Sequence, residues 1–198
     1  FVNLAHGAFA MAGGYVTVVT VNRLGVPFFA SLPIAFLVTA IIGFLFERTL
    51  SVQVYRKSPL DQALFTIGVV FMSVAAVDYV MGSSQVFVQV PNALQGKFDV
   101  FGIGIGRYRL LIIIICGLVT VALQFVLSYT RFGSRLRAAV DDSRVARGLG
   151  INVNRIFAVT FAFGSGLAGL GGALSVEILG LDPTFPLKFM IYFLIVVT

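Results

Sequence analysis

The chain has 198 residues, of which 59% are hydrophobic and 11% are charged. Soluble domains carry roughly 45–50% apolar and about 25% charged residues. The composition therefore excludes a protein that covers its whole surface with polar groups, and it predicts a membrane protein. The formal net charge is +6, but the basic residues lie in loops without interleaved exposed aromatic residues. This distribution argues against nucleic-acid binding.

The reactive residue types are too few for the common enzyme sites. The sequence has one cysteine, Cys116, and one histidine, His6, so it predicts neither an internal disulfide nor a metal site. It contains no GxxxxGK[ST] phosphate-binding loop, no GxSxG turn and no HExxH motif. We expect no cofactor, and an intramembrane enzyme is the least favoured class.

The apolar runs predict a polytopic transmembrane helical bundle of the all-α class, because they are too long for barrel strands. About 20 apolar residues cross a bilayer, and by this measure we expect five full spans and part of a sixth. Because the chain begins at Phe1 and stops inside an apolar run, we expect a fragment, truncated at both ends, of a longer membrane domain that covers 1–198. The predicted spans are about 4–22, 26–46, 63–81, 110–127 and 156–179, with the sixth beginning near 187.

The loops between these spans alternate in charge. Loops 47–62 and 128–155 together hold nine Lys and Arg residues, whereas the opposite side holds five. The positive-inside rule places the two basic loops in the cytoplasm and loop 82–109 outside. In loop 82–109, VFVQV and FDVFGIGIG alternate as strands do around a Pro-Asn turn region. A short hairpin or re-entrant flap and an irregular loop are both compatible with this pattern.

Small residues recur four apart in two of the spans. This spacing lets helix backbones approach closely in lipid, where no hydrophobic force drives helices together. It predicts tight helix contacts and does not separate a channel from a transporter. The residues chosen on this ground are Ala10 and Gly14 in the first span, and Gly164, Ala168 and Gly172 in the fifth.

Few polar residues fall within the predicted spans. Asp78 and Glu177 lie near the external ends of the third and fifth spans, and Asn3 and His6 begin the first. Intramembrane ionisable residues are functional hypotheses by default. These four are therefore candidates for the translocation path, although a mouth-lining or structural role fits each of them as well.

The 128–155 loop carries helix signals. Ser134 is a candidate cap for one short helix, Asp142 or Ser143 for a second, and Gly150 fits a C-terminal stop. Asn152 or Asn154 then caps the next span. Val145 and Leu149, with Ala146 beside them, would form a docking face for a soluble partner. Anchoring of the loop to anionic lipid headgroups fits its arginines equally well.

Three stretches resemble the permease subunits of branched-chain amino-acid ABC importers. They are NLAHGAFAMAGGYV at 3–16, FERTLSVQVYRKSPLDQALFTIGV at 46–69 and RFGSRLRAAVDDSRVARGLGINVNRIFAVTFAFGSGLAGLGGAL at 131–174. In such importers a cytoplasmic loop with an EAA-like pattern docks on the ATPase, and here Arg144 and Val145 replace its Glu-Ala start. The resemblance implies that the coupling residues are Asp142, Arg144, Val145, Ala146, Arg147, Gly148, Leu149 and Gly150.

The same resemblance implies a set of partners and a location. These are two ABC ATPase subunits, a second homologous permease, an extracytoplasmic substrate-binding protein and membrane lipid, in a bacterial or archaeal inner membrane. The implied substrate is a small molecule, a branched-chain amino acid, and ATP hydrolysis would belong to the partner subunits. The alternatives are an ABC permease for urea, amides or another small polar solute, and an ATP-independent channel or secondary carrier.

Overall fold

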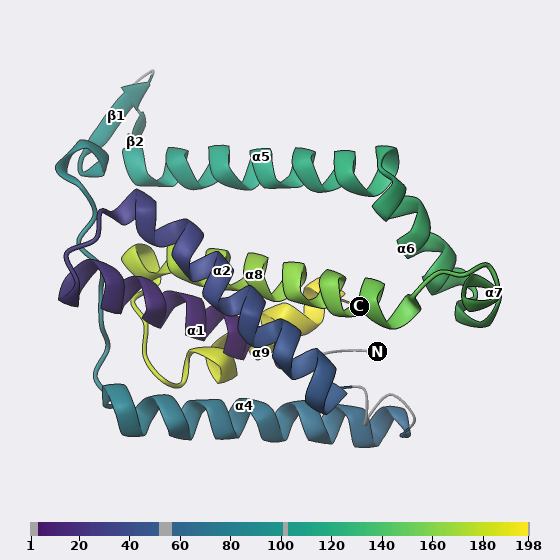
Figure 1. Ribbon diagram of the computed structural model, residues 1–198. Coiled ribbons are helices and arrows are strands. Elements are labelled where there is room, and N and C mark those ends of the chain that lie inside the picture. Colours follow the sequence, from purple (N-terminus) through teal and green to yellow (C-terminus); the bar gives the residue numbers. More distant parts are fainter. Residues whose placement is uncertain (1–3, 52–56, 101–102, 198) are drawn as a thin grey trace. The chain divides into compact units, whose positions relative to one another are not determined.

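The computed structural model describes residues 4–51, 57–100 and 103–197, and nearly all of its regular structure is helical (Figure 1). The chain folds as two compact units, Phe1–Gln89 with Phe161–Thr198, and Val90–Thr160. The longest helix, α8 (Val153–Leu179), begins in the second unit and continues in the first.

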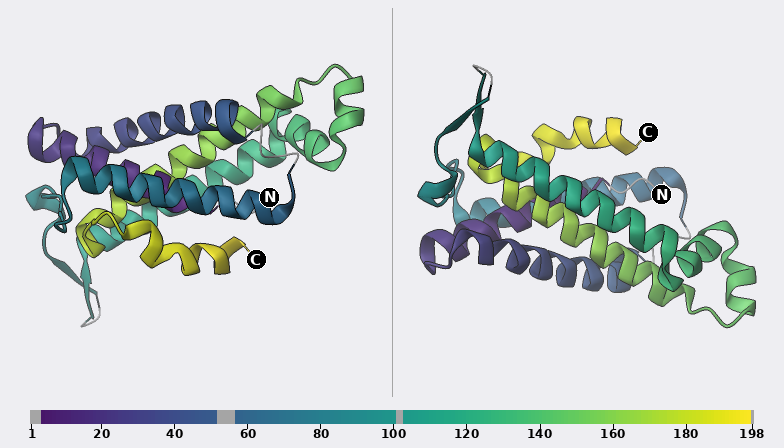
Figure 2. Two further views of the ribbon diagram at one scale, coloured as in Figure 1. Left: turned by 90° about the horizontal axis from the view of Figure 1, so that it is seen from below. Right: turned by 90° about the horizontal axis from the view of Figure 1, so that it is seen from above.

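The first unit is built from five helices. They are α1 (His6–Val18), which continues as a π-helical turn at Val19–Arg23, α2 (Phe28–Phe46), with a π-helical turn at Glu47–Ser51, α4 (Pro59–Met81), the Phe161–Leu179 part of α8, and α9 (Phe185–Val197). Helix α1 packs against α2, α4 and α9 (Figures 1 and 2). Because α1 is largely buried, the core of this unit surrounds it.

The second unit contains a short helical turn, a hairpin and three helices. These are the turn Asn92–Leu94, strands β1 (Lys97–Val100) and β2 (Ile103–Gly106), and helices α5 (Arg107–Tyr129), α6 (Arg131–Asp141) and α7 (Ser143–Gly148). The strands pair antiparallel, with Lys97 opposite Gly106. The hairpin alternative for loop 82–109 is thus confirmed, but it lies wholly within 97–106. Pro91 and Asn92 begin the helical turn instead of joining two strands.

Four helical segments in the described residues are long and apolar enough to cross a membrane. They are Phe28–Thr49, Leu60–Met81, Arg107–Tyr129 and Val153–Leu179. Neither α1 nor the 13 residues of α9 is among them. The helical membrane bundle is therefore confirmed, whereas the number of spans and their grouping into one domain over 1–198 stay predictions.

Helix α4 starts with a capping box. The Ser58 hydroxyl accepts a hydrogen bond from the Asp61 backbone N–H at 3.2 Å, and the Asp61 carboxylate accepts one from the Ser58 N–H at 3.3 Å. Pro59 occupies the first helical turn, where its missing N–H costs nothing. With this capping box, α4 begins at Pro59, four residues before the predicted start of the span at 63. The helix can begin there because the polar side chains satisfy backbone N–H groups at its end.

Buried hydroxyls in the first unit bond to their own helices. Thr17 donates to the Gly13 carbonyl at 3.1 Å, Thr39 to Ala35 at 2.6 Å and Ser165 to Phe161 at 2.8 Å. A bilayer core offers no water to such groups, so each must find a partner within the protein. The helices can therefore carry hydroxyls into the core without exposing unsatisfied donors.

Five aromatic rings meet at the end of the first unit where α2 finishes. Phe46 stacks on Phe65 and Phe161 at centroid distances of 6.1 and 6.0 Å, and meets Phe9 edge-on at 5.8 Å. The His6 ring lies edge-on to Phe9 and Phe161, each at 6.4 Å. Aromatic pairs in these arrangements contribute about 0.5–1.5 kcal/mol beyond their buried area. The cluster joins α1, α2, α4 and α8.

Candidate functional site

The α6–α7 corner holds the residues proposed for coupling. Asp142 is the C-cap residue of α6 and the N-cap residue of α7. Its carboxylate accepts hydrogen bonds from the backbone N–H groups of Arg144 at 2.8 Å and Val145 at 3.0 Å. Gly150 has φ +80° and ends α7. A left-handed residue after a helix is typical of this stop, and glycine adopts it without strain. The predicted cap and stop are thus in place.

One predicted cap is wrong. Thr130, not Ser134, caps α6, because its hydroxyl accepts the Gly133 N–H at 3.3 Å. Ser134 lies inside the helix and donates its hydroxyl to the Thr130 carbonyl at 3.2 Å. A Cβ at Gly133 would come within 2.0 Å of the Leu127 carbonyl oxygen. The chain therefore turns sharply at this glycine, and α6 begins four residues earlier than a cap at Ser134 would allow.

Helix α7 has an inner and an outer face. Ala146 is 1% exposed and packs in a small core with Ala139 and Val153, whereas Val145 and Leu149 are 57% and 74% exposed. The structure therefore places Ala146 inside, where it anchors α7, and not on the outer face beside Val145 and Leu149. The Ile151 N–H donates to the Ala146 carbonyl at 3.0 Å, which fixes α7 against the start of α8.

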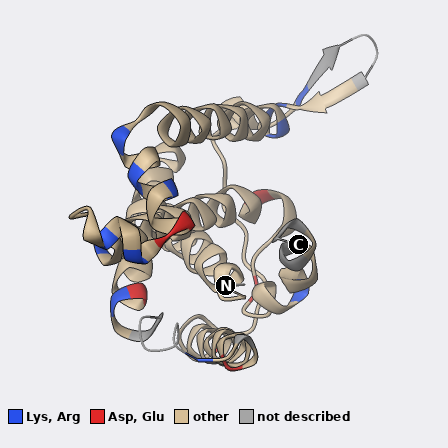
Figure 3. Ribbon diagram, turned by 90° about the vertical axis from the view of Figure 1, so that its right-hand side faces the viewer, with Lys and Arg blue, Asp and Glu red and all other residues tan. Residues whose placement is uncertain are grey.

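Basic residues surround this corner. Figure 3 shows the blue segments that gather along α6 and α7. Arg147 donates to the Asn154 side chain at 3.3 Å, and Asn152 caps α8 by accepting the Arg155 N–H at 3.0 Å. Arg144, Gly148 and Leu149 are exposed. The corner is thus a capped, positively charged helical element that exposes the apolar side chains of Val140, Val145 and Leu149.

Of the small residues predicted to make tight helix contacts, Gly172 and Ala10 do so and Gly164 does not. A Cβ on Gly172 would come within 1.8 Å of the Ala10 carbonyl oxygen, and one on Gly13 within 2.2 Å of the Gly169 carbonyl oxygen. Helices α1 and α8 thus touch backbone to backbone along this line, as small residues permit. A Cβ on Gly14 would instead reach the Leu181 side chain at 2.7 Å. One on Gly164 would meet nothing nearer than His6 at 4.0 Å, and Ala168 is half-buried.

Helix α2 packs on α8 through a second set of small residues. A Cβ on Gly43 would overlap the Ser165 hydroxyl at 1.8 Å, and one on Gly169 would overlap Thr39 at 2.2 Å. Gly13 and Gly43 were not singled out from the sequence. A search for glycines that face each other between spans needs the helix pairing, which a single sequence does not supply.

The translocation candidates do not form one cluster. His6 is exposed and lies in the aromatic cluster at the start of α1. Asp78 and Glu177 lie near the C-terminal ends of α4 and α8, respectively. Asp78 is exposed and accepts the Ser83 hydroxyl at 2.6 Å, and Glu177 is half-buried. Asn3 lies outside the described residues.

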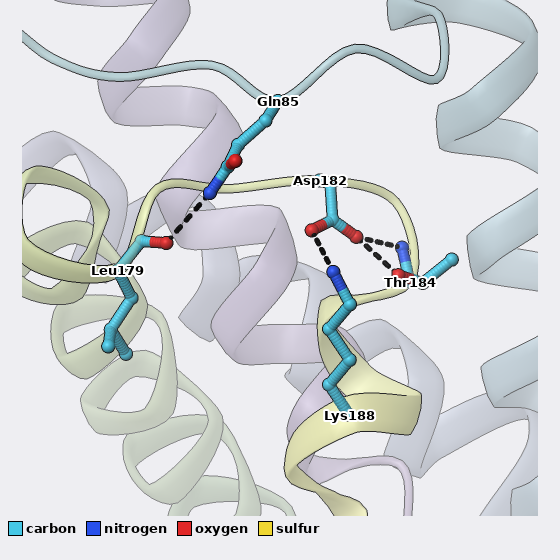
Figure 4. Close-up of polar contacts among 5 residues, drawn as sticks. All are labelled: Gln85, Leu179, Asp182, Thr184 and Lys188. Atoms are coloured by element: carbon cyan, nitrogen blue, oxygen red, sulfur yellow. Dashed lines mark hydrogen bonds and ion pairs between the residues drawn. The ribbon is translucent and has the colours of Figure 1, made fainter.

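A polar linker between α8 and α9 was missed. Asp182 accepts the Thr184 backbone N–H at 2.9 Å and the Thr184 hydroxyl, and it pairs with Lys188 at 2.5 Å (Figure 4). Partial burial alone would raise the pKa of Asp182, but the hydrogen bonds from Lys188 and Thr184 and the Lys188 charge outweigh it and lower the pKa. The Asp-Pro-Thr sequence, typical of a turn that starts on Asp, was the available signal.

The same linker is tied to the segment that follows α4. Val86 and Leu181 exchange two backbone hydrogen bonds of 2.8 and 2.9 Å, and the Gln85 side chain donates to the Leu179 carbonyl at 2.9 Å (Figure 4). The Asn22 side chain donates to the Phe87 carbonyl at 2.9 Å. The segments after α1, α4 and α8 thus meet at one end of the first unit.

Comparison with known proteins extends over the whole chain. Residues 1–198 match the family described as branched-chain amino acid transport system / permease component. The chain is 29% identical over 187 residues to the high-affinity branched-chain amino acid transport system permease protein BraD of Pseudomonas aeruginosa, covering 87% of this chain and 60% of BraD. It is 30% identical over 195 residues to the permease protein LivH of the corresponding Escherichia coli K12 system, covering 90% of this chain and 62% of LivH.

The chain thus spans about 60% of the length of these curated relatives. No solved structure matches it at a significant level. The match to the family nevertheless covers every residue, including the glycine-rich α8 and the capped α6–α7 corner. This chain belongs to the permease component family of branched-chain amino acid transport systems.

Proposed function

We propose that this chain is the membrane-spanning permease part of an ATP-driven importer for branched-chain amino acids in the cytoplasmic membrane. In this proposal it works by alternating access with a second homologous permease subunit. Two ABC ATPases supply the energy from the cytoplasm, and a binding protein delivers the substrate from outside. Family membership supports the transport role, and the names of BraD and LivH support the substrate.

The construction of α7 is the observation that carries the coupling role. Its inner face is held by Ala146, and its ends are fixed by Asp142 and Gly150, yet Val145 and Leu149 are left exposed. A loop that only touched lipid headgroups would not need a buried anchor. An element that must pass a displacement to the spans needs one, because a loose loop would absorb the movement.

Charged residues on the exposed face of α7 should uncouple transport. We expect the double variant Val145→Asp, Leu149→Asp to lower L-leucine uptake and retention of the ATPases by at least about tenfold, which corresponds to about 1.4 kcal/mol of docking free energy. Uptake is measured in proteoliposomes that hold the whole complex, and ATPase retention by copurification. Both side chains are exposed, so the fold of the permease is expected to survive.

The matched control is Leu24→Asp, which adds a carboxylate at a residue that is 68% exposed and lies outside both basic loops. It should leave ATPase copurification unchanged. If the α7 double variant retains the ATPases and transports leucine as the wild type does, the docking role is wrong. A loss that appears only in anionic lipid would identify α7 as a lipid anchor instead.

A further inference from the structure

Helix α6 begins directly after a helix that is long and apolar enough to cross a membrane. Helix α5 runs to Tyr129, and α6 starts at Arg131, with a single residue between them. Two contacts hold α6 there: Gly133 lies against the Leu127 backbone, and the Arg137 guanidinium donates to the Leu127 carbonyl. A helix rises only about 1.5 Å per residue. The first turn of α6 therefore lies at the membrane surface where α5 ends.

Arg131 and Arg135 lie four residues apart on α6. Side chains at this spacing are neighbours on a helix surface, and two like charges there repel each other. Both residues are exposed, and neither guanidinium forms an ion pair or a hydrogen bond with any residue that the structure describes. The guanidinium groups of Arg137 and Arg147, by contrast, each donate to a carbonyl or amide oxygen. The pair thus lacks a counterion.

The position of the two arginines is also unfavourable for α6 itself. A helix carries partial positive charge at its N-terminus, so acidic residues stabilise the first turn and basic residues do not. The first turn of α6 holds no acidic residue and begins with Arg131, whereas Asp141 and Asp142 lie at the opposite end of the helix. An anion from outside the chain would offset both the repulsion between the arginines and the unfavourable dipole.

The last turn of α5 exposes aromatic side chains at the same place. Phe125 and Tyr129 are both exposed, and their ring centroids lie 5.6 Å apart. Tyrosine is enriched where a membrane meets water, because its ring sits at the level of the headgroups. Exposed rings would serve no purpose for a free anion. A phospholipid matches both features, since its phosphate suits guanidinium groups and its apolar part suits the rings.

We propose that Arg131 and Arg135 bind the phosphate group of an anionic phospholipid, while Phe125 and Tyr129 contact the apolar part of the same leaflet. The predicted topology makes this the cytoplasmic leaflet. The site is separate from the exposed face of α7, so the loop divides its tasks: α6 is fixed to the bilayer, and α7 is left to meet a soluble partner. The inference depends on the membrane position of α5 and not on the transported substrate.

The double variant Arg131→Gln, Arg135→Gln tests the site. Binding of phosphatidylglycerol to the detergent-purified protein is measured by native mass spectrometry, with zwitterionic phosphatidylcholine as the reference lipid. We expect the variant to bind phosphatidylglycerol at least about tenfold more weakly than the wild type, and phosphatidylcholine equally. The matched control, Lys57→Gln with Arg155→Gln, removes two exposed charges from the same predicted side of the membrane. It should bind both lipids as the wild type does.

Thermal unfolding separates lipid binding from a structural role of the two arginines. In phosphatidylcholine the double variant should be as stable as the wild type or more stable, because the repulsion and the unfavourable dipole are removed. Phosphatidylglycerol should raise the midpoint of the wild type and of the control, but not that of the double variant. An equal loss of stability by the double variant in both lipids would overturn the site.

Three further results would contradict the proposal. One is equal binding of phosphatidylglycerol by the wild type and the double variant. Another is inorganic phosphate that, at matched ionic strength, stabilises the wild type as much as phosphatidylglycerol does, since this would identify a site for a free anion. The third is normal lipid binding with loss of ATPase copurification, which would assign the arginines to the ATPase. Leucine uptake is not a readout here, so failure of the lipid site leaves the proposed function intact.

Discussion

At the scale of single residues, the polar side chains fall into two kinds. Hydroxyls such as those of Thr17 and Thr39 donate a hydrogen bond to the carbonyl one turn earlier in the same helix, which is the usual solution in lipid. Asp182 instead gathers donors from Thr184 and Lys188 across a linker. Its ionised form is therefore part of what holds the start of α9 to the end of α8.

The hydrogen bonds of Asp182 predict a dependence of stability on pH. The folded protein holds the pKa of this carboxyl below the ordinary value of 3.8. The unfolded chain therefore binds the proton more readily, and Asp182 contributes stability above about pH 4 that is lost as the pH falls through the lower folded value. The thermal midpoint of the detergent-purified protein should accordingly exceed that of Asp182→Asn at pH 7, and the difference should shrink toward pH 3.

The matched control is Asp61→Asn, which changes an exposed cap on α4. A gap between wild type and Asp182→Asn that stays constant from pH 7 to pH 3 would show that ionisation of Asp182 does not contribute.

At the scale of elements, α8 is set apart by two glycine contacts on its inner surface. Gly172 lies against the backbone of α1 at Ala10, and Gly169 lies against Thr39 of α2 as well as Gly13 of α1. No larger residue fits at these points without moving a helix. The separation of α1 and α8 is thus set by backbone contact, whereas α2 meets α8 through side chains such as Thr39 that lie against a glycine.

Adjacent glycines offer a direct test of this contact. Gly172→Ala would bring a Cβ within 1.8 Å of the Ala10 carbonyl oxygen, whereas Gly171→Ala meets nothing within 4 Å. We expect Gly172→Ala to destabilise the protein by about 1–3 kcal/mol, the usual cost of overpacking. Gly171→Ala should be neutral or stabilising, because alanine favours a helix more than glycine does. Thermal unfolding in detergent measures both, and equal midpoints would refute the close contact.

At the scale of the whole molecule, the alternation of basic and weakly charged loops predicts the topology. In the first unit, the segments after α1, α4 and α8 meet through Asn22, Val86 and Leu181, whereas the aromatic cluster lies where α2 ends and α4 begins. This arrangement agrees with loop 47–62 on one side of the membrane and loop 82–109 on the other.

Single cysteines can locate these loops. In a Cys116→Ala background, Lys57→Cys and Arg144→Cys should react with a membrane-impermeant maleimide only from the cytoplasmic side, and Ser84→Cys only from outside. All three positions are exposed, so a lack of labelling from one side reports the barrier and not burial. Labelling of Lys57→Cys and Ser84→Cys from the same side would contradict the topology.

The sequence predicted those features that depend on local chemistry. The cap at Asp142, the stop at Gly150 and the apolar helices follow from neighbouring residues and from periodicity. Features that depend on distant partners were missed or misplaced. The buried Tyr15 hydroxyl is unusual only because it has no hydrogen-bond partner among the described residues, and the inward position of Ala146 depends on Val153. Ser134 was mistaken for a cap because Thr130, four residues earlier, fills that role through the bend at Gly133.

The pairing of Val86 with Leu181 has an evolutionary consequence. It consists of two main-chain hydrogen bonds, so at position 86 any residue with an amide hydrogen can maintain it, and only proline would remove a donor. This backbone pairing therefore requires no particular amino acid at position 86 in the members of a protein family. The amino-acid sequence of the segment after α4 can therefore change while its attachment to the linker between α8 and α9 persists.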